Sequence, residues 1–196
     1  MKVSHSFKRL LTSQTRLKLI NILFYSPQEI FYVRQLVRMT NEEINSVRRE
    51  LENLSSSSII SRETRGNRLY YWANPEHYLF YDLMILANKH TGLGAEIQEN
   101  HLKLGKLKSL FYSQDFLRHL PISPDSIDIL IIGDISLKMA QDLIKPEESV
   151  IGREINYMVM DRGEFHLRLS KRDPIIVDFF LNYPALIIGN PRDSFK

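Results

Sequence analysis

Residues 28–73 read QEIFYVRQLVRMTNEEINSVRRELENLSSSSIISRETRGNRLYYWA. Apolar side chains recur at helical spacing over Tyr32–Met39 and again over Glu42–Leu54, and the Thr40-Asn41 pair between them predicts a tight turn. The second helix should bury one stripe of its surface against its neighbours. That stripe consists of Ile44, Val47, Leu51 and Leu54.

The opposite face of the Glu42–Leu54 helix is polar. Asn and Arg side chains make paired hydrogen bonds with adenine and guanine edges, and Ser can bond to several bases. A helix with an apolar back and such a front can lie in a DNA major groove, although a solvated surface helix would show the same pattern. The polar face carries Glu42, Asn45, Ser46, Arg49 and Asn53, with Arg48 on its flank.

Two short alternating segments, Ile59–Thr64 and Leu69–Trp72, follow this helix. The Arg65–Arg68 run between them predicts a hairpin, because Gly66 and Asn67 tolerate the positive φ of a tight turn. The arginines at the two ends of this run would then face a minor groove or the phosphate backbone. Helices followed by such a hairpin predict a winged helix-turn-helix; the alternative is an ordinary surface hairpin.

A helix predicted between an N-cap at Ser13 and a stop at Ser26-Pro27 precedes these elements. With this helix in place, residues 12–75 resemble the winged-helix domain of the ArsR-like bacterial and archaeal transcription regulators. The metal-sensing members of that group use Cys or His clusters, and this segment has neither Cys nor paired His, so metal sensing is not implied. The runs that carry the resemblance are Phe31–Val37, Ser46–Leu54 and Arg68–Pro75.

Charge is distributed unevenly along the 196 residues. Residues 1–75 carry 12 Lys and Arg against 6 Asp and Glu, whereas residues 76–196 carry 14 against 17. A basic first part suggests that it alone meets a polyanion, although it could be ordinary surface. The chain has no cysteine, no leader-like start and no apolar run long enough to span a membrane, so we expect a soluble cytoplasmic protein.

Residues 76–106 are expected to link two domains, residues 1–75 and residues 107–196. Glu76–Asn88 is a strongly apolar helical segment, and Ala95–Lys108 predicts a second helix. The first of these helices could form a homodimer seam, which would present two recognition helices to a two-fold DNA site. Packing between the two domains of one chain is the alternative.

Beyond residue 106, strand and helix patterns alternate, which predicts a small mixed sheet covered by helices. The expected fold class is therefore α+β, with the winged helix first and an α/β domain second. The predicted strands are Leu107–Phe111, Ile127–Gly133, Glu154–Met160 and Ala185–Ile188, and the predicted helices are Ser136–Ile144, Asp161–Leu169 and Asp173–Leu181.

Three runs of this second part, Leu110–Ser113, Pro124–Asp134 and Gly152–Asn156, carry another resemblance. They look like the minimal nucleotidyltransferase domain of the polymerase-beta superfamily. That family holds nucleotide phosphates on a Gly-Ser turn and binds two Mg²⁺ ions with an Asp-x-Asp pair and a third carboxylate. The corresponding positions here are Tyr112 and Ser113 for the turn, Ser126 and Asp128 for the pair, and Asn156 for the third carboxylate.

These substitutions remove the chemistry that the family requires. Two divalent ions need several anionic oxygens, and Asp128 is the one carboxylate left at the matched positions. Asp125 is close in sequence, but odd neighbours along a strand point to opposite faces. The six histidines lack metal-ligand spacing. We therefore expect neither catalysis nor a metal or cofactor.

The sequence as a whole predicts a transcriptional regulator that binds double-stranded DNA as a homodimer. Asn45, Ser46 and Arg49 are expected to read bases, Arg34 and Arg48 to reach phosphates, and Arg65, Asn67 and Arg68 to form the wing contact. Two alternatives remain open: an antitoxin-like protein that binds a toxin-like partner, and an active Mg²⁺-dependent nucleotidyltransferase.

Overall fold

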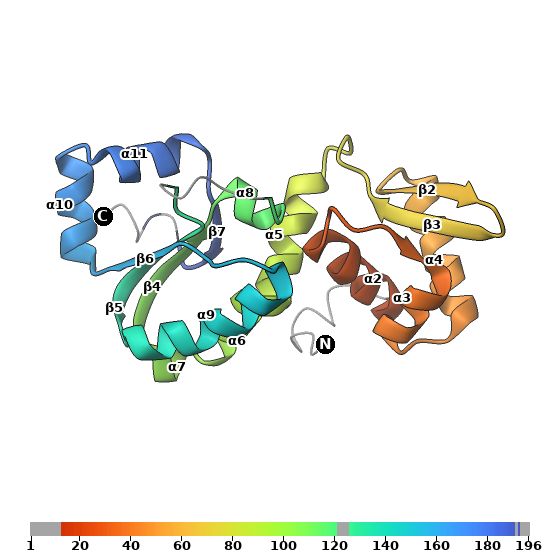
Figure 1. Ribbon diagram of the computed structural model, residues 1–196, viewed down its shortest axis with the longest axis horizontal. Coiled ribbons are helices and arrows are strands. Elements are labelled where there is room, and N and C mark those ends of the chain that lie inside the picture. Colours follow the sequence, from red (N-terminus) through yellow and green to blue (C-terminus); the bar gives the residue numbers. More distant parts are fainter. Residues whose placement is uncertain (1–12, 121–125, 191, 193–196) are drawn as a thin grey trace. The chain divides into compact units, whose positions relative to one another are not determined.

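The computed structural model describes residues 13–120, 126–190 and 192. They form a mixed α+β structure, as expected, which divides into two compact units at Thr91 and Gly92 (Figure 1). Within the described ranges, no helix combines the length and the apolar character that crossing a membrane requires.

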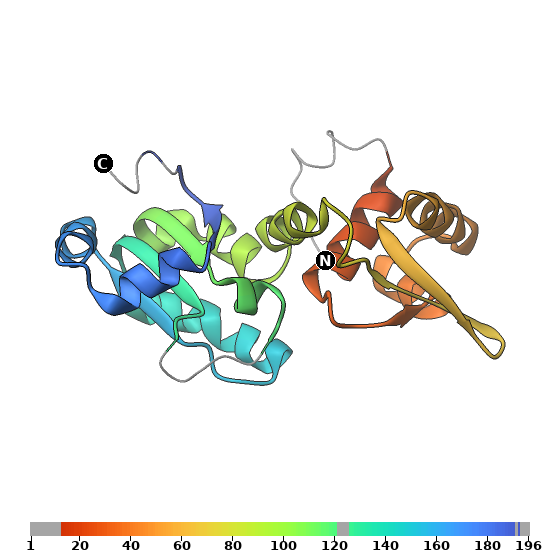
Figure 2. The ribbon, with the colours of Figure 1, turned by 90° about the horizontal axis from the view of Figure 1, so that it is seen from above.

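Among its described residues, the first unit combines four helices with a three-stranded antiparallel sheet of order β1-β3-β2. Its tip, the β2–β3 hairpin, projects beyond the helices (Figure 1 and Figure 2). The elements are α2 (Gln14–Tyr25), β1 (Phe31–Tyr32), α3 (Val33–Thr40), α4 (Ile44–Ser56), β2 (Ile60–Arg65), β3 (Arg68–Ala73) and α5 (Phe80–His90).

Local side-chain chemistry sets the ends of these helices. The Ser13 Oγ accepts a hydrogen bond from the Arg16 backbone N–H at 3.2 Å, which confirms the predicted N-cap. Asn41 ends α3 in the left-handed conformation with φ 51°, and Glu43 then caps α4 by accepting from the Asn45 N–H at 2.7 Å. The three predicted helices are thus confirmed, whereas the short strand β1 was missed.

The hairpin has the predicted two-residue tip. Arg65 and Arg68 face each other at the last pair of the β2–β3 ladder. Gly66 takes a positive φ of 57°, but Asn67 does not, so only one of the two expected left-handed residues is used. Positive φ at the first central residue alone fits a type II′ turn, whose twist matches that of the flanking strands.

The first unit extends past the predicted border at residue 75. Phe80, Met84 and Ala87 of α5 are buried in the same core as α2, and the Phe24 and Phe80 rings lie 6.0 Å apart. The apolar side of α5 is therefore used within this unit, and this helix is not a separate linker.

The second unit is built on a four-stranded sheet of order β6-β5-β4-β7. β5 and β6 are parallel while the other pairs are antiparallel, which confirms the predicted small mixed sheet. The elements are α6 (Gly92–Glu99), α7 (His101–Leu104), β4 (Gly105–Tyr112), α8 (Gln114–Leu117), β5 (Ile129–Ile135), α9 (Leu137–Ile151), β6 (Tyr157–Met160), α10 (Arg162–Ser170), α11 (Pro174–Leu181) and β7 (Ala185–Ile188).

Helices cover both faces of this sheet (Figure 1). Leu130 and Ile132 of β5 share one cluster with Phe165 of α10 and Ile176 of α11. Alternate β5 residues such as Ile131 point to the other face, on the side of α6 and α9. This alternation explains why β5 is apolar along most of its length.

The predicted helix over Ala95–Lys108 is confirmed only in its first part, as the two helices α6 and α7, and its last residues are wrong. Helix α7 ends at Leu104, and Gly105 starts β4 with φ 122°. A Cβ at Gly105 would lie 2.6 Å from the backbone oxygen of Asp134, so the close approach of β4 to β5 requires glycine there. The pairing with β5 overrides the helical pattern of the sequence.

Candidate nucleic-acid interface and the Asp128 site

The inner side of α4 is fixed by packing and by a buried carboxylate. Val47 and Leu51 lie in the core of the first unit, and Glu50 between them is only 3% exposed. The Glu50 carboxylate accepts hydrogen bonds from Arg16 Nε at 2.8 Å and Ser13 Oγ at 2.9 Å. These contacts tie α4 to the start of α2. The sequence pattern does not indicate these contacts, because a Glu in an amphipathic helix is usually solvated.

The same contacts set the charge of Glu50. Burial by itself would raise the pKa of this carboxyl, but hydrogen bonds from Ser13, Arg16 and Asn53 outweigh burial and lower the pKa below its ordinary value. Glu50 therefore stays ionised at neutral pH and neutralises Arg16 on the inner side of α4.

The outer face of α4 presents unpaired polar side chains. Asn45, Arg48 and Arg49 are exposed, and Ser46 is half-buried at the edge of this face. Within the part of the chain that the structure describes, neither Arg48 nor Arg49 forms a side-chain hydrogen bond or an ion pair. Their guanidinium groups are thus available to an external acceptor, as the sequence led us to expect.

A groove of about 690 Å³ lies between α3, α4 and the hairpin. We call it the arginine groove, because Arg34 of α3, Arg48 of α4 and Arg68 of β3 all line it. The Arg68 guanidinium carbon lies 5.3 Å from the centroid of the Tyr32 ring. The remaining lining residues are Val33, Glu52, Asn67, Leu69 and Tyr71.

The three predicted contact residues at the hairpin tip, Arg65, Asn67 and Arg68, lie in different surroundings. Asn67 and Arg68 line the arginine groove, whereas Arg65 does not. Arg65 forms an ion pair with Glu63 at 2.7 Å and lies 5.5 Å from the Tyr70 ring centroid. Its charge is therefore already partly neutralised, which the sequence pattern could not indicate.

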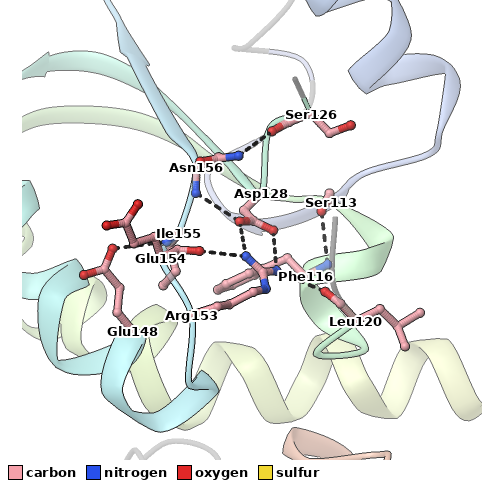
Figure 3. A network of polar contacts seen from close by, with 10 residues as sticks. All are labelled: Ser113, Phe116, Leu120, Ser126, Asp128, Glu148, Arg153, Glu154, Ile155 and Asn156. Atoms are coloured by element: carbon pink, nitrogen blue, oxygen red, sulfur yellow. Dashed lines mark hydrogen bonds and ion pairs between the residues drawn. The ribbon is translucent and has the colours of Figure 1, made fainter. Parts of the chain in front are cut away.

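In the second unit, three residues at the positions compared with a nucleotidyltransferase site, Ser113, Ser126 and Asn156, lie around Asp128 (Figure 3). The Asp128 side chain has no exposed surface. Arg153 donates to both of its carboxylate oxygens, from Nη1 at 2.6 Å and from Nη2 at 2.8 Å. The Asn156 backbone N–H donates a third hydrogen bond at 3.0 Å. Asp128 is thus saturated by protein donors.

Arg153, which no sequence motif marks, organises this site. It also donates to the backbone oxygens of Leu120 and Glu154, at 3.1 and 2.9 Å (Figure 3). Its hydrogen bonds to Asp128 raise its pKa further, against the opposing effect of burial. The guanidinium therefore remains charged and places a positive charge against Asp128.

The other matched positions lie near Asp128 but serve structural roles. Asn156 Nδ2 donates to the Ser126 backbone oxygen at 3.3 Å. The Ser113 N–H donates to the Asp128 backbone oxygen at 2.8 Å, and the Ser113 Oγ caps α8. Tyr112 is buried against Phe116, with ring centroids 4.8 Å apart, and burial raises the pKa of its phenol well above the ordinary value. Asp125 lies outside the described residues.

The described residues contain no group of three or more His, Cys, Asp or Glu side chains that could hold a metal ion. The negative charge of Asp128 is neutralised by Arg153, and this ion pair stabilises the start of β5. A small cavity of about 150 Å³ adjoins Ser113 and Ser126.

No family model matches this chain, and no curated protein or solved structure matches it either.

Proposed function

We propose that the chain is a sequence-specific DNA-binding transcriptional regulator whose first unit is an ArsR-like winged helix-turn-helix domain. In this proposal, α4 lies in the major groove and the β2–β3 hairpin is the wing. The regulator acts as a homodimer on double-stranded DNA in the cytoplasm.

The observation that carries the proposal is the contrast between the two sides of α4. Its inner side is locked by core packing and by the Glu50–Arg16 ion pair. Its outer side offers Asn45 and Arg49, which are exposed and form no side-chain hydrogen bond with a described residue. A helix that is rigidly held and chemically unsatisfied on one face suits direct readout of base edges.

The roles of the residues follow from their positions. Asn45, Ser46 and Arg49 occupy the first turns of α4, the part of such a helix that meets base edges. Asn67 and Arg68 form the main wing contact, and Arg65 contributes less because Glu63 neutralises it. Arg34 and Arg48 lie beside this face and approach phosphates.

For the second unit, we propose a nucleotidyltransferase-like domain that has lost catalysis and serves dimerisation or effector binding. The Arg153–Asp128 ion pair supports this view, because the one carboxylate retained at the matched positions is already neutralised. Neither alternative, a toxin-like partner or an active nucleotidyltransferase, has a specific observation in its favour.

The test is selection of binding sites from random-sequence duplexes by the purified full chain at two salt concentrations. A palindromic consensus supports dimeric readout, and retention of unrelated duplexes that weakens steeply with salt contradicts it. Arg49→Ala should then cost about 1–3 kcal/mol on the consensus and relax preference at one position. Arg38→Ala, an exposed arginine of α3, is the matched control. Equal behaviour of the two variants would refute the role of Arg49.

A further inference from the structure

The arginine groove brings three guanidinium groups from three separate elements to one concave surface. Arg34, Arg48 and Arg68 are all exposed residues. In the ranges that the structure describes, no carboxylate lies within ion-pair distance of any of them. By contrast, Arg16, Arg62 and Arg65 each pair with a glutamate. The positive charge of these three arginines is therefore left uncompensated by the described protein carboxylates.

The acidic residue that lines the groove does not change this balance. The Glu52 carboxylate is engaged by Arg62 of β2, on the neighbouring strand of the hairpin. The rest of the lining is mainly aromatic and aliphatic, with Tyr32, Leu69 and Tyr71 among it. Such a surface suits an anionic group flanked on both sides by groups less polar than itself.

We infer that the arginine groove binds a phosphate of the DNA backbone and so fixes the position of α4 on the duplex without reading sequence. The inference rests on the proposed function. The fork of an Arg guanidinium matches phosphate geometry, and about 690 Å³ leaves room for the flanking deoxyriboses. Because the groove lies between α4 and the hairpin, one strand can contact it while both elements reach their DNA grooves.

The experiment measures affinity of the full chain for a labelled random-sequence duplex, by fluorescence anisotropy over a series of salt concentrations. Arg34→Gln, Arg48→Gln and Arg68→Gln should each weaken binding about tenfold at low salt. Each should also flatten the slope of log affinity against log salt, by about one at most, because the groove neutralises a single phosphate. Arg38→Gln, on the same helix as Arg34 but outside the groove, should change neither.

Arg68 packs on the Tyr32 ring, so Arg68→Gln also removes a contact that holds the hairpin. Arg48 has no such ring contact with a described residue. Where the results for Arg48→Gln and Arg68→Gln differ, the result for Arg48→Gln therefore decides. If Arg48→Gln binds a selected consensus with the same affinity and the same salt slope as the wild type, the groove inference is overturned while sequence-specific binding stands. A slope change without any consensus supports the groove and refutes sequence-specific readout. Displacement of the duplex by inorganic phosphate at matched ionic strength would instead identify a free-anion site and overturn the assignment to the backbone.

Discussion

Arg153 donates one hydrogen bond to each carboxylate oxygen of Asp128, and this carboxylate has no exposed surface. A buried carboxylate without a partner would be neutralised by protonation or expelled to solvent. The guanidinium supplies the compensating charge from within the chain. The pair therefore accounts for a buried charged residue directly before β5.

Arg153→Met should destabilise the second unit by about 3–5 kcal/mol, because it leaves Asp128 buried and unpaired. Adding Asp128→Asn should recover part of this loss. Far-UV circular dichroism during urea unfolding reports both units, whereas Trp72, the sole tryptophan of the chain, reports the first. The circular dichroism transition should move and the fluorescence transition should not. Arg162→Met, at an exposed position, is the control, and an equal effect of the two substitutions would contradict the argument.

Removal of divalent cations should leave the protein unchanged. Because Arg153 already occupies the Asp128 oxygens, added Mg²⁺ or Mn²⁺ has no anionic pair to bind there. The melting temperature in EDTA should equal that in excess Mg²⁺, and no label should be transferred from a radioactive nucleoside triphosphate. Cation-dependent transfer that Asp128→Asn abolishes would establish the enzymatic alternative.

Acid should weaken the link between α2 and α4 through Glu50. The folded-state pKa of Glu50 lies below its ordinary value of 4.5, so its stabilising effect is complete above that pH and is lost as pH falls through the folded pKa. Glu50→Gln should lower the free energy of unfolding of the first unit by about 1–2 kcal/mol at neutral pH. It should also reduce the loss of that free energy in acid, as followed by Trp72 fluorescence. Glu29→Gln, on an exposed side chain, should leave the loss in acid unchanged. Parallel pH profiles for wild type and Glu50→Gln would exclude this role.

Gly66→Ala should destabilise the hairpin by about 1 kcal/mol. The cost is conformational, since φ is 57° at Gly66 and a Cβ there would meet nothing within 4 Å. Asn tolerates this backbone region better than Ala, so Gly66→Asn should cost less. Urea unfolding followed by Trp72 fluorescence compares the variants. A larger loss for Asn than for Ala would point to a side-chain clash instead.

The sequence predicted elements well where local signals determine them. Ser13, Asn41 and Asp161 end or begin helices through contacts within a few residues, and these ends agree with the structure. Gly105 behaves differently, because its role depends on β5, which is distant along the chain. A helical pattern over Ala95–Lys108 could not reveal that pairing.

The candidate sites show the same limit. The exposure of Asn45 and Arg49 followed from helical periodicity, which is a local property. Arg153 was missed because the importance of an arginine depends on which carboxylate it meets, and Asp128 is 25 residues away. Likewise, composition does not reveal that Arg65 forms an ion pair with Glu63 while Arg68 lies over the Tyr32 ring.

Glu63 should restrain the affinity of the hairpin for DNA. It holds Arg65 in an ion pair at the exposed tip, so Glu63→Gln frees one guanidinium and removes one negative charge near the proposed wing contact. Affinity for random duplexes should rise several-fold and become more salt-sensitive, because one more phosphate contact can form. Arg65→Gln should have a smaller effect than Arg68→Gln, and in the Glu63→Gln background its effect should grow. Anisotropy titrations of the four variants and the wild type measure this coupling directly. Additive effects of Glu63→Gln and Arg65→Gln would mean that the ion pair does not control Arg65, and that the wing binds through Arg68 and Asn67 alone.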